Sequence, residues 1–152
     1  MQIINRKEIN NGFNIAIVTS HYNQEITQAL FTGAVDRLQQ LGFKDEQITA
    51  VSVPGAVEIP LAAQRLALTK KFEAIICLGA VIFGETKHFD YVCEQVSQGC
   101  QQVALTHNLP VIFGVLTTMN LDQAKARVGG HKGHVGRECA DAAVWQVSVL
   151  RQ

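Results

Sequence analysis

The feature that most constrains the fold of this chain is a regular alternation of short apolar runs with longer segments of helical periodicity. The apolar runs, rich in valine, isoleucine and alanine, cover residues 13–19, 48–53, 72–78 and 111–116. A strand that is apolar on both faces is typical of a parallel sheet covered by helices on both sides. We therefore predict an α/β domain built around a four-stranded parallel sheet.

The segments between the apolar runs carry helix signals. Apolar residues recur at helical spacing in four segments: 26–41, 56–68, 89–103 and 136–150. Asn120 with Gln123 resembles a capping box, which predicts a short helix ending near residues 129–130. Right-handed crossovers would arrange residues 1–152 as one flavodoxin-like three-layer α/β/α sandwich. The first dozen residues do not fit this core, and we expect them to pair with a neighbouring subunit.

The charge composition bears on partners and location. Thirteen basic residues balance thirteen acidic ones, which argues against attraction to nucleic acid or to an anionic membrane surface. No apolar run approaches the length of a membrane span, and the N-terminus lacks the apolar core of a signal peptide, so we expect a cytoplasmic protein. Charged residues make up 17% of the chain, against about 25% in typical soluble domains. This shortage predicts that part of the surface is hidden in a homo-oligomer.

Neither the cysteines nor the histidines form a recognisable metal motif. The four cysteines contain no CxxC pair and lie in apolar or helical surroundings, so we interpret them as reduced core residues. His131 and His134 are spaced i, i+3, but no acidic or cysteine partner stands beside them. We therefore predict no metal site.

Polar, aromatic and glycine residues follow each predicted strand. They occupy residues 20–23, 54–58, 79–88 and 117–120. Ligands of open parallel sheets bind outside the carboxyl ends of the strands, where these four segments would meet. The sequence thus predicts a binding site on that edge of the sheet.

The richest of these segments reads GAVIFGETKHFDYV and starts at Gly79. Residues 84–86 precede a predicted helix, whose free N–H groups and positive end would suit a phosphate; an ordinary turn with Thr86 as helix cap is the alternative. His88 in the first helical turn is a candidate general acid–base, or else a solvated or packed histidine. Glu85 and Thr86 stand where a P-loop needs Lys-Ser/Thr, and no GxGxxG follows the first strand, so neither nucleotide motif is present.

Three other residues have two interpretations each. Glu58 could accept hydrogen bonds from a polyol, or could only stabilise a helix dipole. Tyr22 could stack on a flat heterocycle or simply pack. Arg127 could clamp a phosphate or complement a helix C-terminus. Ser20 lacks the GxSxG context of a serine hydrolase.

Three segments together resemble one family: VPGAVEIPLAA, LGAVIFGETKHFDYVCEQVSQG and PVIFGVLTT. The family is that of 6,7-dimethyl-8-ribityllumazine synthase, which catalyses the penultimate step of riboflavin biosynthesis, and the resemblance runs from about Phe13 into the last helix. It implies condensation of 5-amino-6-(D-ribitylamino)uracil with 3,4-dihydroxy-2-butanone 4-phosphate, with loss of phosphate and water. It also implies no metal or organic cofactor, a pentamer or a shell of pentamers, and riboflavin synthase as a possible protein partner.

The resemblance also assigns residues to roles. Binding of the pyrimidine and its ribityl chain is implied for Tyr22, Ala56, Val57, Glu58, Ala80, Val81, Ile82 and, from the adjacent subunit, Phe113. Binding of the phosphate is implied for Glu85, Thr86 and, from the adjacent subunit, Arg127. His88 would transfer protons.

The chain departs from the family pattern at four positions. Tyr22 stands where phenylalanine or tryptophan is usual, Phe83 replaces a commonly basic residue, and His131 and Val135 replace lysines. A noncatalytic flavin- or lumazine-binding module and a structural shell protein are the alternatives to an enzyme. The joint presence of the phosphate, ribityl and proton-transfer residues favours the enzyme.

Overall fold

A four-stranded parallel sheet forms the centre of the computed structural model, which describes residues 1–152. Its strands are β1 (Ile15–Ser20), β2 (Ile48–Val53), β3 (Ala74–Ile82) and β4 (Val111–Thr118), arranged in the order β2-β1-β3-β4. All three neighbouring pairs are parallel. The predicted flavodoxin-like α/β fold is therefore confirmed, with β1 and β3 in the interior and β2 and β4 at the edges.

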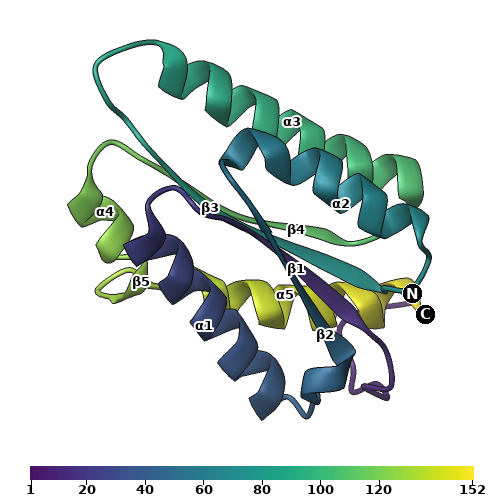
Figure 1. Cartoon of the computed structure of the whole chain (residues 1–152). Coiled ribbons are helices and arrows are strands. Elements are labelled where there is room, and N and C mark those ends of the chain that lie inside the picture. The colour runs from purple at the N-terminus through teal and green to yellow at the C-terminus, as the bar shows by residue number, and fades with distance from the viewer.

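Two helices cover each face of the sheet. Helices α1 (Gln24–Gln40) and α5 (Val135–Leu150) pack on one face, and α2 (Ile59–Leu68) and α3 (His88–His107) pack on the other, as Figure 1 shows. Buried residues form two apolar clusters, one on each side of the sheet. The three predicted layers are thus present, and none of the helices has both the length and the apolarity to cross a bilayer.

Strand β1 shows why the apolar runs are continuous. Ile15 and Ile17 belong to the cluster under α1 and α5, whereas Ala16 and Val18 belong to the cluster under α2 and α3. All four side chains are fully buried. Successive side chains of a strand point to opposite faces, so a strand with helices on both sides must be apolar at every position.

The structure corrects the predicted end of the third strand. The apolar run predicted a strand over 72–78, whereas β3 spans Ala74–Ile82. Its last four residues pair with β4 alone, because the β1–β3 ladder stops at Thr19 and Leu78. The partner strand, rather than the apolar run itself, sets the length of β3.

Two further segments differ from the sequence prediction. The helix predicted from Asn120 to about residue 130 is the short α4 (Leu121–Lys125), followed by a hairpin of β5 (Val128–Gly130) and β6 (Gly133–His134). The helix predicted over 56–68 starts as a 3-10 turn, η2 (Ala56–Glu58), before α2 begins. A second 3-10 turn, η1 (Asp45–Gln47), precedes β2.

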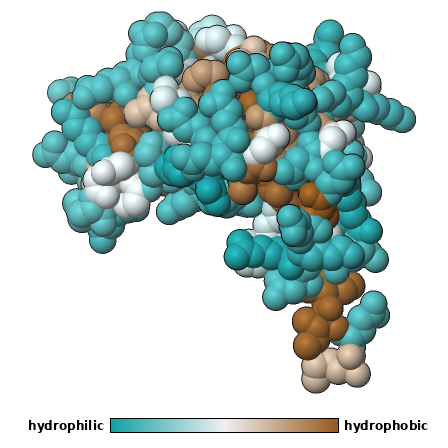
Figure 2. Space-filling view, turned by 90° about the horizontal axis from the view of Figure 1, so that it is seen from below, coloured by the Kyte–Doolittle hydropathy of each residue, from teal (hydrophilic) through white to brown (hydrophobic).

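The first ten residues form no helix or strand and lie partly along α5. The Gln152 amide donates to the carbonyl of Asn5 at 2.7 Å, and the Arg6 guanidinium lies 4.8 Å from the centre of the Trp145 ring. Ile3 and Ile4 are exposed, and Figure 2 shows an apolar tip protruding from the molecule. This chain alone therefore leaves apolar N-terminal residues uncovered.

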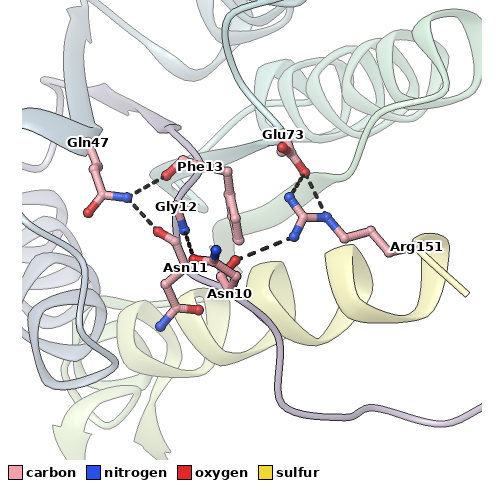
Figure 3. Close-up of polar contacts among 7 residues, drawn as sticks. All are labelled: Asn10, Asn11, Gly12, Phe13, Gln47, Glu73 and Arg151. Carbon is pink, nitrogen blue, oxygen red and sulfur yellow. Dashed lines mark hydrogen bonds and ion pairs between the residues drawn. The ribbon is translucent and has the colours of Figure 1, made fainter.

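The chain is fixed where it enters β1. The Gln47 amide donates to the carbonyls of Asn11 and Phe13, and Arg151 pairs with Glu73 while its guanidinium lies 5.0 Å from the Phe13 ring. Figure 3 shows these contacts joining η1, the segment before β3 and the end of α5. They hold the start of β1 at the end of the sheet opposite the polar segments.

The cysteines lie mainly in the core, as predicted. Cys77, Cys100 and Cys139 are buried, Cys93 is half-buried, and all four are free thiols. Burial raises the pKa of the Cys139 thiol to about 12. A hydrogen bond with Cys100, together with burial, raises the pKa of Cys77, and burial together with the Asp90 carboxylate raises the pKa of Cys93. A raised pKa leaves less of the reactive thiolate at neutral pH.

We expect at most one cysteine, Cys93, to react with iodoacetamide in the folded protein at about pH 8, because the thiols of Cys77, Cys100 and Cys139 are buried. Mass spectrometry after a fixed exposure, with and without urea, measures this. All four should be alkylated in urea. Rapid alkylation of Cys139 in the folded protein would contradict the burial described here.

Helices α1 and α5 approach each other closely through two glycines. A Cβ atom on Gly136 would lie 2.2 Å from the carbonyl oxygen of Leu30, and one on Gly33 would lie 2.1 Å from the His134 ring. Gly136 meets backbone and therefore requires glycine as long as the helices keep this spacing, whereas a Cβ at Gly33 would require the His134 ring to move.

Gly136→Ala should lower the free energy of unfolding by about 1–3 kcal/mol, the usual cost of overpacking, because the new methyl group meets backbone atoms. The matched control is Gly84→Ala, since a Cβ at Gly84 meets no atom within 4 Å. Urea unfolding of both variants provides the comparison. Equal stability of the two would show that the α1–α5 contact is looser than described.

Candidate active site

A cavity of about 300 Å³ lies at the carboxyl ends of β1 and β3, on the predicted edge of the sheet. Its walls come from the turn after β1, from η2, from the end of β3 and from the first turns of α3. Most of the predicted site residues line it: Tyr22, Ala56, Val57, Glu58, Ala80, Val81, Ile82, Thr86 and His88. The fold thus brings together residues from three separate segments of the sequence.

The extension of β3 beyond β1 gives the cavity a free backbone edge. The amides of Ile75 and Phe83 donate toward β4, to Pro110 and Thr118. Amides of successive residues point to opposite sides of a strand, so the Ile82 N–H points to the side where β1 has already ended. No protein group accepts a hydrogen bond from it there, and it is available to a ligand.

Tyr22 stands at the mouth of the cavity with 64% of its surface exposed. A Cβ atom on Gly55 would lie 3.0 Å from two carbons of its ring. The ring therefore rests against the bare backbone of Gly55, and much of its surface remains uncovered. An exposed ring in this position can stack on a flat ligand.

The Glu58 carboxylate has both a structural contact and spare capacity. Its Oε2 accepts a hydrogen bond from the backbone N–H of Gly55 at 2.9 Å, which closes the 3-10 turn. Its other oxygen makes no hydrogen bond within the protein and can accept one from a hydroxyl group in the cavity. The two interpretations of Glu58 are therefore compatible.

The loop of residues 83–87 joins β3 to α3 beside the cavity. The Phe83 ring packs edge-to-face on Phe89 at 5.6 Å and is not part of the cavity wall. Thr86 Oγ1 accepts a hydrogen bond from the His88 N–H at 3.3 Å, but the N-cap of α3 is Lys87, so Thr86 is not the helix cap that its alternative interpretation predicted. Its hydroxyl proton is still free to donate, and the space beside Gly84 is open.

His88 is the first residue of α3, and its side chain is exposed on the cavity wall. No protein group hydrogen-bonds to its imidazole ring. Both ring nitrogens can therefore exchange protons with a bound ligand.

Three predicted site residues lie outside the cavity wall. Glu85 is exposed in the loop next to Gly84. Phe113 is 41% exposed on the edge strand β4, opposite Cys77 in the register. Arg127 follows α4, where its Nη1 donates to the carbonyl of Gln123 at 2.8 Å. Within one chain, the fold does not bring Phe113 or Arg127 to the cavity.

The residue roles implied by the family resemblance leave out five residues of the cavity wall, of which Asn23, Gly55 and Gly84 lie within the predicted polar segments and Phe89 and Val92 lie outside them. Phe89 and Val92 were interpreted only as the packing face of a helix. Asn23 stood in a polar segment after a strand, but nothing in the sequence indicated its contact, a hydrogen bond from Nδ2 to the carbonyl of Ala80 at 2.8 Å.

The chain offers no assembled metal site, since no three histidine, cysteine or acidic side chains converge anywhere in it. A second, smaller cavity of about 180 Å³ lies between α1 and β2 and contains none of the predicted site residues. The predicted site residues that share a cavity therefore all line the one between β1, β3 and α3.

Comparison with known proteins identifies the family to which the chain belongs. The family model of 6,7-dimethyl-8-ribityllumazine synthase matches residues 12–151. Proteins of that name from Coxiella burnetii strains CbuG_Q212 and RSA 493 / Nine Mile phase I are each 53% identical to this chain over 141 residues, which is 93% of either chain. The resemblance of the three sequence segments is thus confirmed, and the chain belongs to the 6,7-dimethyl-8-ribityllumazine synthase family.

Proposed function

We propose that this protein is a lumazine synthase. It would condense 5-amino-6-(D-ribitylamino)uracil with 3,4-dihydroxy-2-butanone 4-phosphate to 6,7-dimethyl-8-ribityllumazine, releasing phosphate and water. The observation that carries this proposal is the convergence of an exposed aromatic ring, a carboxylate and an unpaired imidazole on one cavity. The names of the relatives, which state the product, support it.

The pyrimidine and its ribityl chain fit the inner part of the cavity. The Tyr22 ring would stack on the heterocycle, and the free N–H of Ile82 would donate to a ring carbonyl. The ribityl chain would lie along η2, where the second oxygen of Glu58 can accept a hydrogen bond from a hydroxyl group. Apolar lining by residues 80–82 would exclude water around the ring.

The phosphate of the second substrate would lie at the start of α3. A helix N-terminus attracts anions through its free N–H groups and its positive dipole end. Thr86 would add its hydroxyl, and Glu85 would contribute through its backbone. Arg127 from an adjacent subunit would supply the positive charge, in a bidentate contact with phosphate oxygens.

His88 would move the protons between these two regions. Attack of the pyrimidine amine on the ketone, loss of one water to form the imine, elimination of phosphate, and ring closure with loss of a second water each require a proton to be taken from one atom and given to another. An imidazole that no protein group engages can do both. Holding the two substrates side by side would supply the rest of the acceleration.

The active sites would be shared between subunits of a pentamer or a shell of pentamers. Phe113 and Arg127 are remote from the cavity of their own chain, while β4 is an edge strand on the surface. Apolar residues 3 and 4 are uncovered, which supports pairing of the N-terminal segment with a neighbour. The low share of charged residues, 17%, supports extensive burial of surface in such an assembly.

Mixing the purified protein with both substrates tests the proposal directly. Appearance of the lumazine chromophore supports an enzyme. Binding of lumazine without its formation would instead identify a noncatalytic binding module.

His88→Ala should slow turnover by about 100-fold, the scale of general acid–base catalysis, and leave the assembly intact. The matched control is His107→Ala at the other end of α3, which should keep wild-type turnover. Stopped-flow absorbance and sedimentation velocity measure the two properties. Wild-type turnover by His88→Ala would remove His88 from the proposed role.

Arg127→Ala should raise KM for the phosphate substrate and leave KM for the pyrimidine unchanged. Lys125→Ala is the control, because Lys125 is a nearby cation that pairs with Glu25 at 3.5 Å.

Subunits carrying His88→Ala and subunits carrying Arg127→Ala, refolded together, should regain activity, since about a quarter of randomly mixed shared sites contain both native residues. Activity no greater than the average of the two variants would contradict sharing of the site.

A further inference from the structure

Asn23 combines two unusual features at the edge of the cavity. Its backbone is left-handed, with φ 62° and ψ 49°, and its carbonyl accepts from two amides in the first turn of α1, those of Ile26 and Thr27. A residue in this N-cap position normally uses its side chain to cap the helix, but Asn23 makes no such bond. Its side-chain amide donates instead to the Ala80 carbonyl on β3, at 2.8 Å.

This contact completes the edge of β3 where β1 is missing. The carbonyl and amide of Ala80 point toward β1, as those of Leu78 do, but the ladder has ended at Leu78. The side-chain amide of Asn23 supplies the donor that the strand no longer provides. Two residues further along the same edge, the Ile82 N–H remains free. The cavity edge therefore presents a free hydrogen-bond donor, while the Ala80 carbonyl next to it on this edge is already occupied by Asn23.

We propose that Asn23 is a positioning residue for the pyrimidine pocket. By holding the Ala80 carbonyl, it fixes the end of β3 so that the Ile82 N–H faces a carbonyl of the heterocycle. Its left-handed backbone turns the chain so that the adjacent Tyr22 ring rests on Gly55. This inference rests on the proposed function, because it assumes a pyrimidine in the cavity.

The two features can be separated by substitution. Asn23→Gly keeps the left-handed backbone, which glycine adopts freely, and removes the amide. Asn23→Asp keeps the shape and tolerates the same backbone, but places a carboxylate against the Ala80 carbonyl. The matched control is Asn108, the left-handed C-cap of α3 with φ 51°, which does not line the cavity.

The same two substitutions are made at Asn23 and at Asn108. For each of these four variants, the experiment measures KM for each substrate, kcat and the midpoint of thermal unfolding. Asn23→Gly should raise KM for the pyrimidine by about 10-fold, on the scale of one lost hydrogen bond to an ordered group, and Asn23→Asp should raise it further. KM for the phosphate substrate should stay within about 2-fold, since the start of α3 is untouched. The Asn108 variants should leave both KM values unchanged.

Wild-type KM for the pyrimidine in both Asn23 variants, with normal wild-type turnover, would overturn the role of Asn23 alone. A lower KM in the Asp variant than in the Gly variant would show that the Ala80 carbonyl is not the partner that matters. Loss of thermal stability with unchanged KM would reveal a purely structural contact. Absence of both turnover and pyrimidine binding in the wild-type protein would overturn the proposed function and this inference together. If the Gly variant fails to fold, the Asp variant decides.

Discussion

The candidate site depends on one mismatch of length within the sheet. Strands β3 and β4 support each other over residues to which β1 has no counterpart, so β3 carries four residues beyond its inner partner. That overhang exposes backbone groups in an otherwise fully paired interior strand. The turn after β1, η2 and the start of α3 enclose the space that β1 vacates. A β1 of equal length would fill the cavity.

Around this overhang, several side chains line the cavity or bond to its edge, and do not only stabilise the turn or helix in which they stand. Asn23 stands at a helix start but bonds to another strand, and Glu58 bonds within its turn with one oxygen while presenting the other. Gly55 yields space to the Tyr22 ring. Local rules are commonly broken at functional sites, where geometry for a ligand takes precedence over the best local arrangement. Such departures cluster here.

One chain contains only part of the proposed chemistry. The imidazole, the carboxylate and the stacking ring share a cavity, whereas the only arginine assigned to the phosphate lies after α4. In this chain the only basic side chain of the loop beside the proposed phosphate position is Lys87. A subunit interface that adds Arg127 would supply further positive charge, which links affinity for the phosphate to assembly.

The sequence by itself determined the four strands of the parallel sheet, the main helices between them and the edge of the sheet on which the cavity lies. Apolar patterning reports burial, and burial on both faces of β1 and β3 leaves little freedom in the fold. It did not determine where β3 ends, the β5–β6 hairpin, or the bond from Asn23 to Ala80. Those features depend on hydrogen-bond partners distant in the chain, and periodicity carries no information about which partner a backbone group finds. Only the tertiary structure decided them, because a strand continues only as far as a neighbouring strand pairs with it.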